Sequence, residues 1–78
     1  MYFVYALYSI SFDRLYIGFT NDLSRRLNEH NSKKNKSTKA YVPWKLIHRE
    51  EFETRLEARK REKYLKSGIG REYLRRII

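Results

Sequence analysis

Two tyrosines near the start of the chain have side chains and a spacing that could form one chemical site. Tyr5 lies in an apolar segment over residues 2–9, and Tyr16 lies in a second one over residues 15–19. Both segments are rich in aromatic and β-branched residues, which predicts two strands of a hairpin joined by a polar turn. A phenol can donate or accept a proton, but tyrosines in strands are also common in ordinary packing. The residue types leave both interpretations open.

Alternation along the second strand predicts where Tyr16 points. Neighbouring residues face opposite sides of a sheet, so Tyr16 faces outward if Ile17 and Phe19 fill the core. Gly18 has no side chain, and a glycine within a strand often marks the close approach of another backbone. We therefore expect Tyr16 and Gly18 to lie where a ligand contacts the protein.

An arginine and a histidine share one side of the first predicted helix. Thr20 and Asn21 are candidate caps for a helix over residues 22–31. Arg26 and His30 lie four residues apart in it, so they project together. The arginine could bind a phosphate, and the histidine could position water or carry a proton. A solvated basic helix face fits the same pattern.

One carboxylate has an unusual place in the next predicted helix, which a capping box at residues 54–57 opens and which runs to about Lys66. Glu62 falls there on a stripe of small and apolar residues instead of among the lysines. Magnesium prefers oxygen ligands and keeps several waters, so one carboxylate and a substrate phosphate suffice to hold it. The alternative, which the helix pattern alone favours, is an ion pair with Arg59 or Arg61.

The elements that carry these residues follow a simple order. A third strand is predicted over residues 44–52, the helix that carries Glu62 stops at Gly68, and a last helix contains Ile69, Tyr73, Leu74 and Ile77 at helical spacing. The order strand, strand, helix, strand, helix, helix predicts an α+β fold with a small three-stranded antiparallel sheet flanked by helices.

The chain is strongly basic, with 18 Lys and Arg against nine Asp and Glu and a formal charge of +9. A polyanion such as nucleic acid is the expected partner, and its binding should weaken as salt rises. Residues 31–43 are polar and lysine-rich, which predicts a mobile loop with no core of its own. Tyr41 and Trp44 at its end fit either base stacking or packing. Contacts to nucleic acid are expected from Gly18, Arg25, Lys33, Lys34, Lys36 and Lys39.

Length and composition exclude several classes of protein. The 78 residues support one core, so we expect a single domain over residues 1–78. The absence of cysteine excludes zinc fingers, disulfide frameworks and cysteine nucleases. The first residues do not resemble a signal peptide, and no apolar run approaches the roughly 20 residues needed to cross a bilayer, so we expect a cytoplasmic protein with no membrane partner.

The joint order of these motifs resembles the GIY-YIG nuclease superfamily, and more narrowly its small stand-alone bacterial proteins of the excinuclease-like or endonuclease-like kind. The resemblance spans nearly the whole chain. The residues that carry it are Tyr5, Tyr16-Ile17-Gly18, Leu23 to Leu27, His30-Asn31, Thr38-Lys39, Pro43-Trp44, Ala58, Arg61-Glu62 and Leu65 to Gly68.

The resemblance implies hydrolysis of phosphodiester bonds in DNA, assisted by Mg²⁺ or Mn²⁺. By position, Tyr5 would be the general base and Tyr16 would orient the attacking water or the phosphate. Arg26 would neutralise charge on the phosphate, His30 would lie within reach of the same site, and Glu62 would bind the metal. A phenol with a pKa near 10 is a poor base at neutral pH, so nearby positive charge would have to lower its pKa.

The chain departs from the family pattern in three places. Residues 3–5 read Phe-Val-Tyr instead of Gly-Ile-Tyr, Phe19 stands where some relatives have lysine, and no asparagine follows Asn35. Most enzymes of the family also carry a separate DNA-recognition domain, and the motifs here predict none. We therefore expect specificity to come from the loop, a protein partner or the shape of the DNA. A non-catalytic nucleic-acid-binding module, and a basic protein that docks on an acidic protein or ribosomal RNA, are the alternatives. The sequence does not fix the oligomeric state.

Overall fold

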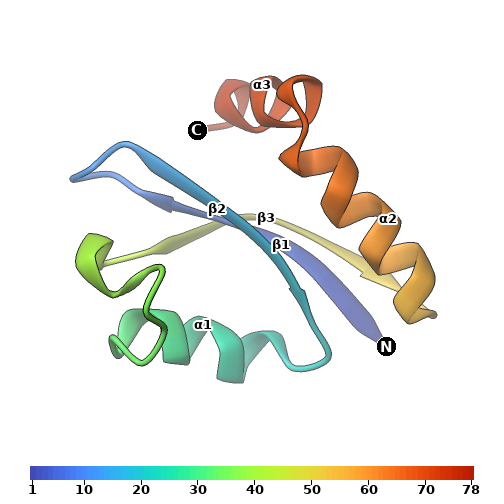
Figure 1. Cartoon of the computed structure of the whole chain (residues 1–78), viewed down its shortest axis with the longest axis horizontal. Helices are drawn as coiled ribbons and strands as arrows, with labels where there is room; N and C mark the ends of the chain where they lie inside the picture. Colours follow the sequence, from blue (N-terminus) through green and yellow to red (C-terminus); the bar gives the residue numbers. More distant parts are fainter.

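A hairpin, a helix, a third strand and two more helices follow one another in the computed structural model, which describes residues 1–78 (Figure 1). This is the predicted α+β order, with one short 3-10 helix added. No helix combines the length and the apolar character needed to cross a membrane. The elements are β1 (Tyr2–Ser9), β2 (Arg14–Thr20), α1 (Leu23–Asn31), the 3-10 helix η1 (Lys39–Tyr41), β3 (Lys45–Phe52), α2 (Arg55–Lys66) and α3 (Gly68–Arg76).

The antiparallel sheet has the strand order β2-β1-β3 and is covered on both faces, by α1 on one and by α2 and α3 on the other (Figure 1). Residues of β1 alternate between two cores. Val4 and Ala6 pack with the buried side chains of α2 and α3. Tyr5 and Leu7 pack with Trp44 and with partly buried residues of α1. The central strand therefore carries one apolar cluster on each face.

Tyr16 lies on the α1 face, opposite to Ile17, as alternation predicts. The expectation that it points outward is wrong, because that face is also covered. Tyr16 packs against the second core, with its ring centroid 6.3 Å from that of Trp44. Alternation assigns a residue to a face, but it does not say whether another element covers that face.

The cap of α1 is Asp22, and neither Thr20 nor Asn21 takes that place as predicted. The Asp22 side chain accepts a hydrogen bond from the backbone N–H of Arg25 at 3.1 Å. The Thr20 hydroxyl is used differently, because it accepts a bond from the Asp22 backbone N–H at 3.1 Å. The threonine at the end of β2 thus closes the turn that presents Asp22 to the helix.

The segment between α1 and β3 is folded back on α1, and the prediction of a loop without a core is wrong. Thr38 is fully buried, and its carbonyl accepts a hydrogen bond from the Trp44 indole N–H at 2.9 Å. The Asn31 amide bonds to both the N–H and the carbonyl of Trp44, at 2.6 and 3.1 Å. Trp44 is therefore a packing residue, as one of the two interpretations had it. The lysines of the segment stay exposed.

The two C-terminal helices meet at Ser67, which ends α2 and caps α3 by accepting a bond from the Gly70 N–H at 3.3 Å. Gly68 was predicted to stop the helix, but it is the first residue of α3. Thr54 caps α2 as predicted, since its side chain accepts from the Glu57 N–H at 3.2 Å, but the Glu57 carboxylate accepts from the Thr54 hydroxyl at 2.9 Å instead of from its backbone N–H. Within α3 the apolar stripe is mostly exposed, and of its large side chains only Leu74 is buried.

Gly70 allows this close junction, because a Cβ at its position would overlap the Tyr64 carbonyl oxygen and the Leu65 backbone. We expect Gly70→Ala to destabilise the fold by roughly 1–3 kcal/mol, since the obstruction is backbone and cannot rotate away. Gly68→Ala is the matched control, because nothing lies within 4 Å of its added Cβ. Thermal unfolding of both variants checks this, and a Gly70→Ala midpoint at or above that of Gly68→Ala contradicts it.

Candidate active site

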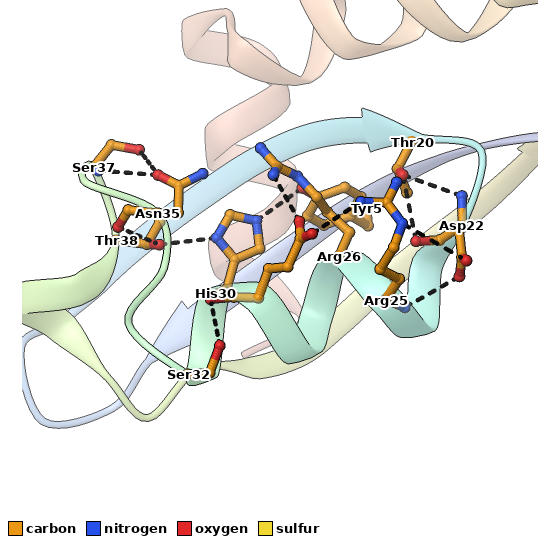
Figure 2. A network of polar contacts seen from close by, with 11 residues as sticks. Tyr5, Thr20, Asp22, Arg25, Arg26, His30, Ser32, Asn35, Ser37 and Thr38 are labelled. Atoms are coloured by element: carbon orange, nitrogen blue, oxygen red, sulfur yellow. Dashed lines mark hydrogen bonds and ion pairs between the residues drawn. The ribbon is translucent and has the colours of Figure 1, made fainter.

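The structure brings together four of the five side chains that were predicted to be catalytic. Tyr5 of β1, Tyr16 of β2 and His30 of α1 have ring centroids 4.7 to 6.3 Å apart. Arg26 lies one helical turn before His30 and beside the Tyr5 ring (Figure 2). The predicted pairing of Arg26 with His30 on one side of α1 is correct, but that side faces the sheet instead of solvent. His30 is 0% exposed.

A chain of buried hydrogen bonds runs through this cluster (Figure 2). The Tyr5 hydroxyl lies 2.9 Å from His30 Nε2, and His30 Nδ1 lies 2.9 Å from the Thr38 hydroxyl oxygen. The Thr38 hydroxyl makes a longer bond to the Asn35 carbonyl, at 3.5 Å. Because a carbonyl only accepts, Thr38 donates to Asn35 and accepts from Nδ1–H of His30. His30 Nε2 is then the acceptor for the Tyr5 hydroxyl proton.

The electrostatics of the cluster agree with this assignment. Burial and then the positive charge of Arg26 lower the pKa of His30 to about 4, against an opposing effect of Glu29, so the imidazole is neutral at pH 7. Burial raises the pKa of Tyr5 to about 12, with Tyr16 and Glu62 adding to the rise and Arg26 opposing it. The expectation that positive charge lowers the pKa of Tyr5 is therefore not met in the free protein, because burial outweighs Arg26. A neutral phenol donates to a neutral imidazole.

Gly18 makes room for Tyr5, its direct partner in the hairpin. A Cβ at residue 18 would lie 2.8 Å from the Tyr5 hydroxyl oxygen and 3.2 Å from the Tyr16 ring. The space beside Gly18 is thus filled by the two tyrosines, and it does not admit a ligand backbone as predicted. The missing side chain positions Tyr5 instead.

Arg26 lies at the rim of the cluster, with its side chain 32% exposed. Its Nη1 donates to Glu29 at 3.0 Å, and Arg25 donates to the other oxygen of the same carboxylate at 2.9 Å. Arg26 and then Arg25 hold the pKa of Glu29 below its ordinary value. Glu29 therefore orients the arginine that faces the cluster. Exposed Arg25, predicted to contact nucleic acid, is partly neutralised by this pair.

Glu62 is the one predicted catalytic residue that the structure does not bring into contact with the others. It belongs to α2, on the other face of the sheet, and its side chain is 7% exposed. Its oxygens pair with Arg59 at 3.1 Å and Lys66 at 3.0 Å. The predicted alternative of an ion pair is correct for Arg59 and wrong for Arg61, which bonds to Glu50. The charge of Glu62 still reaches the cluster, because it contributes to the raised pKa of Tyr5.

Glu62 is the one residue of the predicted catalytic set whose side chain offers carboxylate oxygens to a divalent cation. No group of three His, Cys, Asp or Glu side chains is placed to hold a metal, but magnesium commonly uses one or two carboxylates with substrate phosphates. The two cations that pair with Glu62 are themselves about half exposed. Because Glu62 itself is nearly buried, a metal ion bound there would have to compete with both cations.

Three polar residues of the site were not singled out in the sequence. Glu29 holds Arg26, and Thr38 and Asn35 complete the hydrogen-bond chain from His30. Thr38 does stand in one of the motifs that carry the family resemblance. Glu29 lies at helical spacing from both arginines, which was the available signal for an ion pair. Nothing in the composition of the lysine-rich segment indicates that Thr38 is buried.

Several known proteins are similar in sequence to this chain over part or all of its length. A UPF0213 protein of Clostridium perfringens is 40% identical over 78 residues, which are 99% of this chain and 83% of that protein. One of Bacillus velezensis is 51% identical over 49 residues, 62% of this chain. The chain spans only 50% of that protein and 60% of a Streptococcus agalactiae relative.

A solved structure supports the fold independently. The solution NMR structure of a UPF0213 protein of Bacillus halodurans matches with a TM-score of 0.57 and 32% identity, over 95% of this chain and 82% of that one. The family model described as the GIY-YIG catalytic domain matches residues 1–73. That range contains all five residues that the motifs assign to catalysis. With the sheet, the helices and the tyrosine–arginine–histidine cluster in place, this chain belongs to the GIY-YIG catalytic domain family.

Proposed function

We propose that this chain is a divalent-metal-dependent endonuclease that hydrolyses phosphodiester bonds in DNA. The family is one of nuclease-type catalytic domains. The observation that supports catalysis most strongly is the buried hydrogen bond between Tyr5 and His30, 2.9 Å long, with Arg26 at its open side. A phenol, a neutral imidazole and a partly exposed guanidinium are the groups needed to bind a phosphate and move a proton.

Arg26 would bind the scissile phosphate. Its side chain is the exposed cation of the cluster, and in the free protein it is turned toward Glu29. A phosphate oxygen would replace the Glu29 carboxylate as its acceptor, and the guanidinium would stabilise the charge that develops on the phosphorus oxygens. Tyr16, half-buried beside His30, would orient the phosphate or the attacking water.

Tyr5 would take a proton from water, and His30 would take the Tyr5 proton through the bond that already joins them. Because the pKa of Tyr5 is about 12 and that of His30 about 4, this transfer is unfavourable in the free protein. A divalent cation held by Glu62, on the other face of the sheet, would act on the cluster through its positive charge. Neutralising Glu62 also removes one contribution that raises the pKa of Tyr5. The proposal thus couples Glu62 to the cluster through charge.

The segment that follows α1 supports binding of a DNA backbone. No Asp or Glu lies between Glu29 and Glu50 in the sequence. The exposed cations there are Lys33, Lys34, Lys36, Lys39, Lys45 and Arg49, of which only Arg49 is in an ion pair, with Glu51. The segment begins directly after His30, so its positive charge adjoins the cluster. Phosphate binding by such lysines releases counterions and depends steeply on salt.

A non-catalytic DNA-binding module is the second candidate. Two observations favour it: Tyr5 is 1% exposed with a raised pKa, and Glu62 is already paired with two cations. Both candidates predict DNA binding, and only the endonuclease predicts cleavage that requires metal and Glu62. They are therefore separated by measuring cleavage and binding on the same variant.

Glu62→Gln should reduce nicking of plasmid or branched DNA by roughly two orders of magnitude or more in Mg²⁺ or Mn²⁺, as expected for removal of a charge-stabilising group. Wild-type nicking should also stop when EDTA removes the metal, while DNA binding of the variant persists. Glu53→Gln is the matched control, because this exposed carboxylate lies outside the site. Equal background cleavage by the wild type and Glu62→Gln would reject the endonuclease and leave the binding module.

Gly18→Ala should displace the Tyr5 hydroxyl, because the added Cβ would lie 2.8 Å from it. We expect nicking to fall at least about tenfold while the domain stays folded, since overpacking typically costs about 1–3 kcal/mol. Circular dichroism and DNA affinity in EDTA report on folding, and the nicking rate reports on the site. Full nicking activity in folded Gly18→Ala would show that the position of Tyr5 does not matter for cleavage.

A further inference from the structure

The hairpin tip, which is the turn between Ser9 of β1 and Arg14 of β2, carries an exposed aromatic side chain outside the catalytic cluster. Phe12, between β1 and β2, is 51% exposed, and its ring meets the Tyr41 ring edge-on with centroids 5.4 Å apart. Figure 1 shows the β1–β2 turn and η1 at the same end of the sheet. The two rings come from segments far apart in the sequence, so the pair is a product of the fold.

Positive charge surrounds these two rings. The Arg14 guanidinium carbon lies 4.5 Å from the centre of the Tyr41 ring. Exposed Lys39 begins η1, and exposed Lys45 lies opposite Tyr8 in the sheet. Cations beside an aromatic face match the phosphates and bases of a nucleic acid strand.

The one acidic residue of the tip does not cancel this charge, because it is already paired. The Asp13 carboxylate accepts from the Tyr8 hydroxyl at 2.9 Å and from Arg75 of α3 at 2.6 Å. Arg75 and then Tyr8 hold the pKa of Asp13 below its ordinary value. Asp13 also has a left-handed backbone, with φ of 51°. These contacts fix the turn and leave Arg14 outside any ion pair with Asp13.

A second exposed apolar surface, on α3, lacks this combination. Its residues Ile69, Tyr73 and Ile77 are exposed, and Arg71 there is in no ion pair, but Arg75 and Arg76 are paired with Asp13 and Glu72. The one aromatic ring of this surface, Tyr73, meets the His48 ring edge-on instead of a second exposed ring with an arginine over it. The hairpin tip therefore has the better match to a polyanion with flat aromatic groups. A row of rings also links it to the cluster, since Tyr41 packs on Trp44 at 6.4 Å and Trp44 packs on Tyr16 at 6.3 Å.

We propose that Phe12, supported by Tyr41 and Arg14, stacks on an unpaired base of the DNA, so that the preferred substrate has a single strand next to a duplex. This inference rests on the proposed action on DNA and specifies the substrate. Lysines bind the phosphates of single and double strands alike, but a base in a duplex is already stacked and only an unpaired base offers its face. The row of rings, with neighbouring centroids 5.4 to 6.4 Å apart, connects the position of that base to Tyr16 of the cluster.

Binding measured in EDTA tests the proposal without cleavage. The probes are a blunt DNA duplex and the same duplex with a single-stranded overhang that contains 2-aminopurine. The wild type should bind the overhang probe roughly tenfold more tightly than the blunt one, as stacking of one base provides, and should quench 2-aminopurine fluorescence. Phe12→Ala should lose both the preference and the quenching while its affinity for the blunt duplex is unchanged.

Two variants control for the fold and for the loss of an exposed apolar side chain elsewhere on the surface. Phe12→Trp keeps an aromatic face and should retain the preference. Leu56→Ala removes a side chain that is 66% exposed at the start of α2, at the other end of the molecule, and should change nothing (Figure 1). Equal wild-type affinity for the two probes, or an equal loss on both in Phe12→Ala, overturns the proposal. A preference without any nicking in Mg²⁺ rejects the endonuclease alone and supports base stacking.

Discussion

The hydrogen bond between the Tyr5 hydroxyl and His30 Nε2 is the contact on which the site depends. Both groups are buried, and a buried polar group without a partner costs about 1–3 kcal/mol. The bond therefore fixes β1 against α1, and the bond from His30 to Thr38 fixes the following segment against both. Gly18 leaves the space for Tyr5. Removing the side chain of Tyr5, His30 or Thr38 would leave a polar group unpaired beneath α1.

The sequence predicts the order of elements well because the signals are local. Alternating apolar residues mark the strands, and the capping box at Thr54 marks the start of α2. Local signals do not report what covers a face, so the second core under Tyr16 and the burial of Thr38 were missed. The motifs assign five residues to the site, but only the fold shows that Glu62 lies apart from the other four side chains.

Charge is distributed unevenly between α1 and the segment that follows it. Acidic residues pair with the helix arginines, as Glu29 does with Arg25 and Arg26. The lysines that follow His30 have no acidic neighbour in the sequence before Glu50. DNA would therefore meet a cationic segment whose inner side, through Thr38, holds the histidine of the site. The proposed contacts to the DNA backbone and the orientation of His30 thus depend on the same segment.

The protonation state of His30 is the most direct test of this account, and ¹⁵N-resolved NMR of its imidazole measures it. The account predicts a neutral ring that carries its proton on Nδ1, with Nε2 bare, and that titrates only near pH 4. A proton on Nε2, or titration near the ordinary value of 6.5, would contradict it. Either result would mean that His30 does not accept the Tyr5 proton in a buried chain.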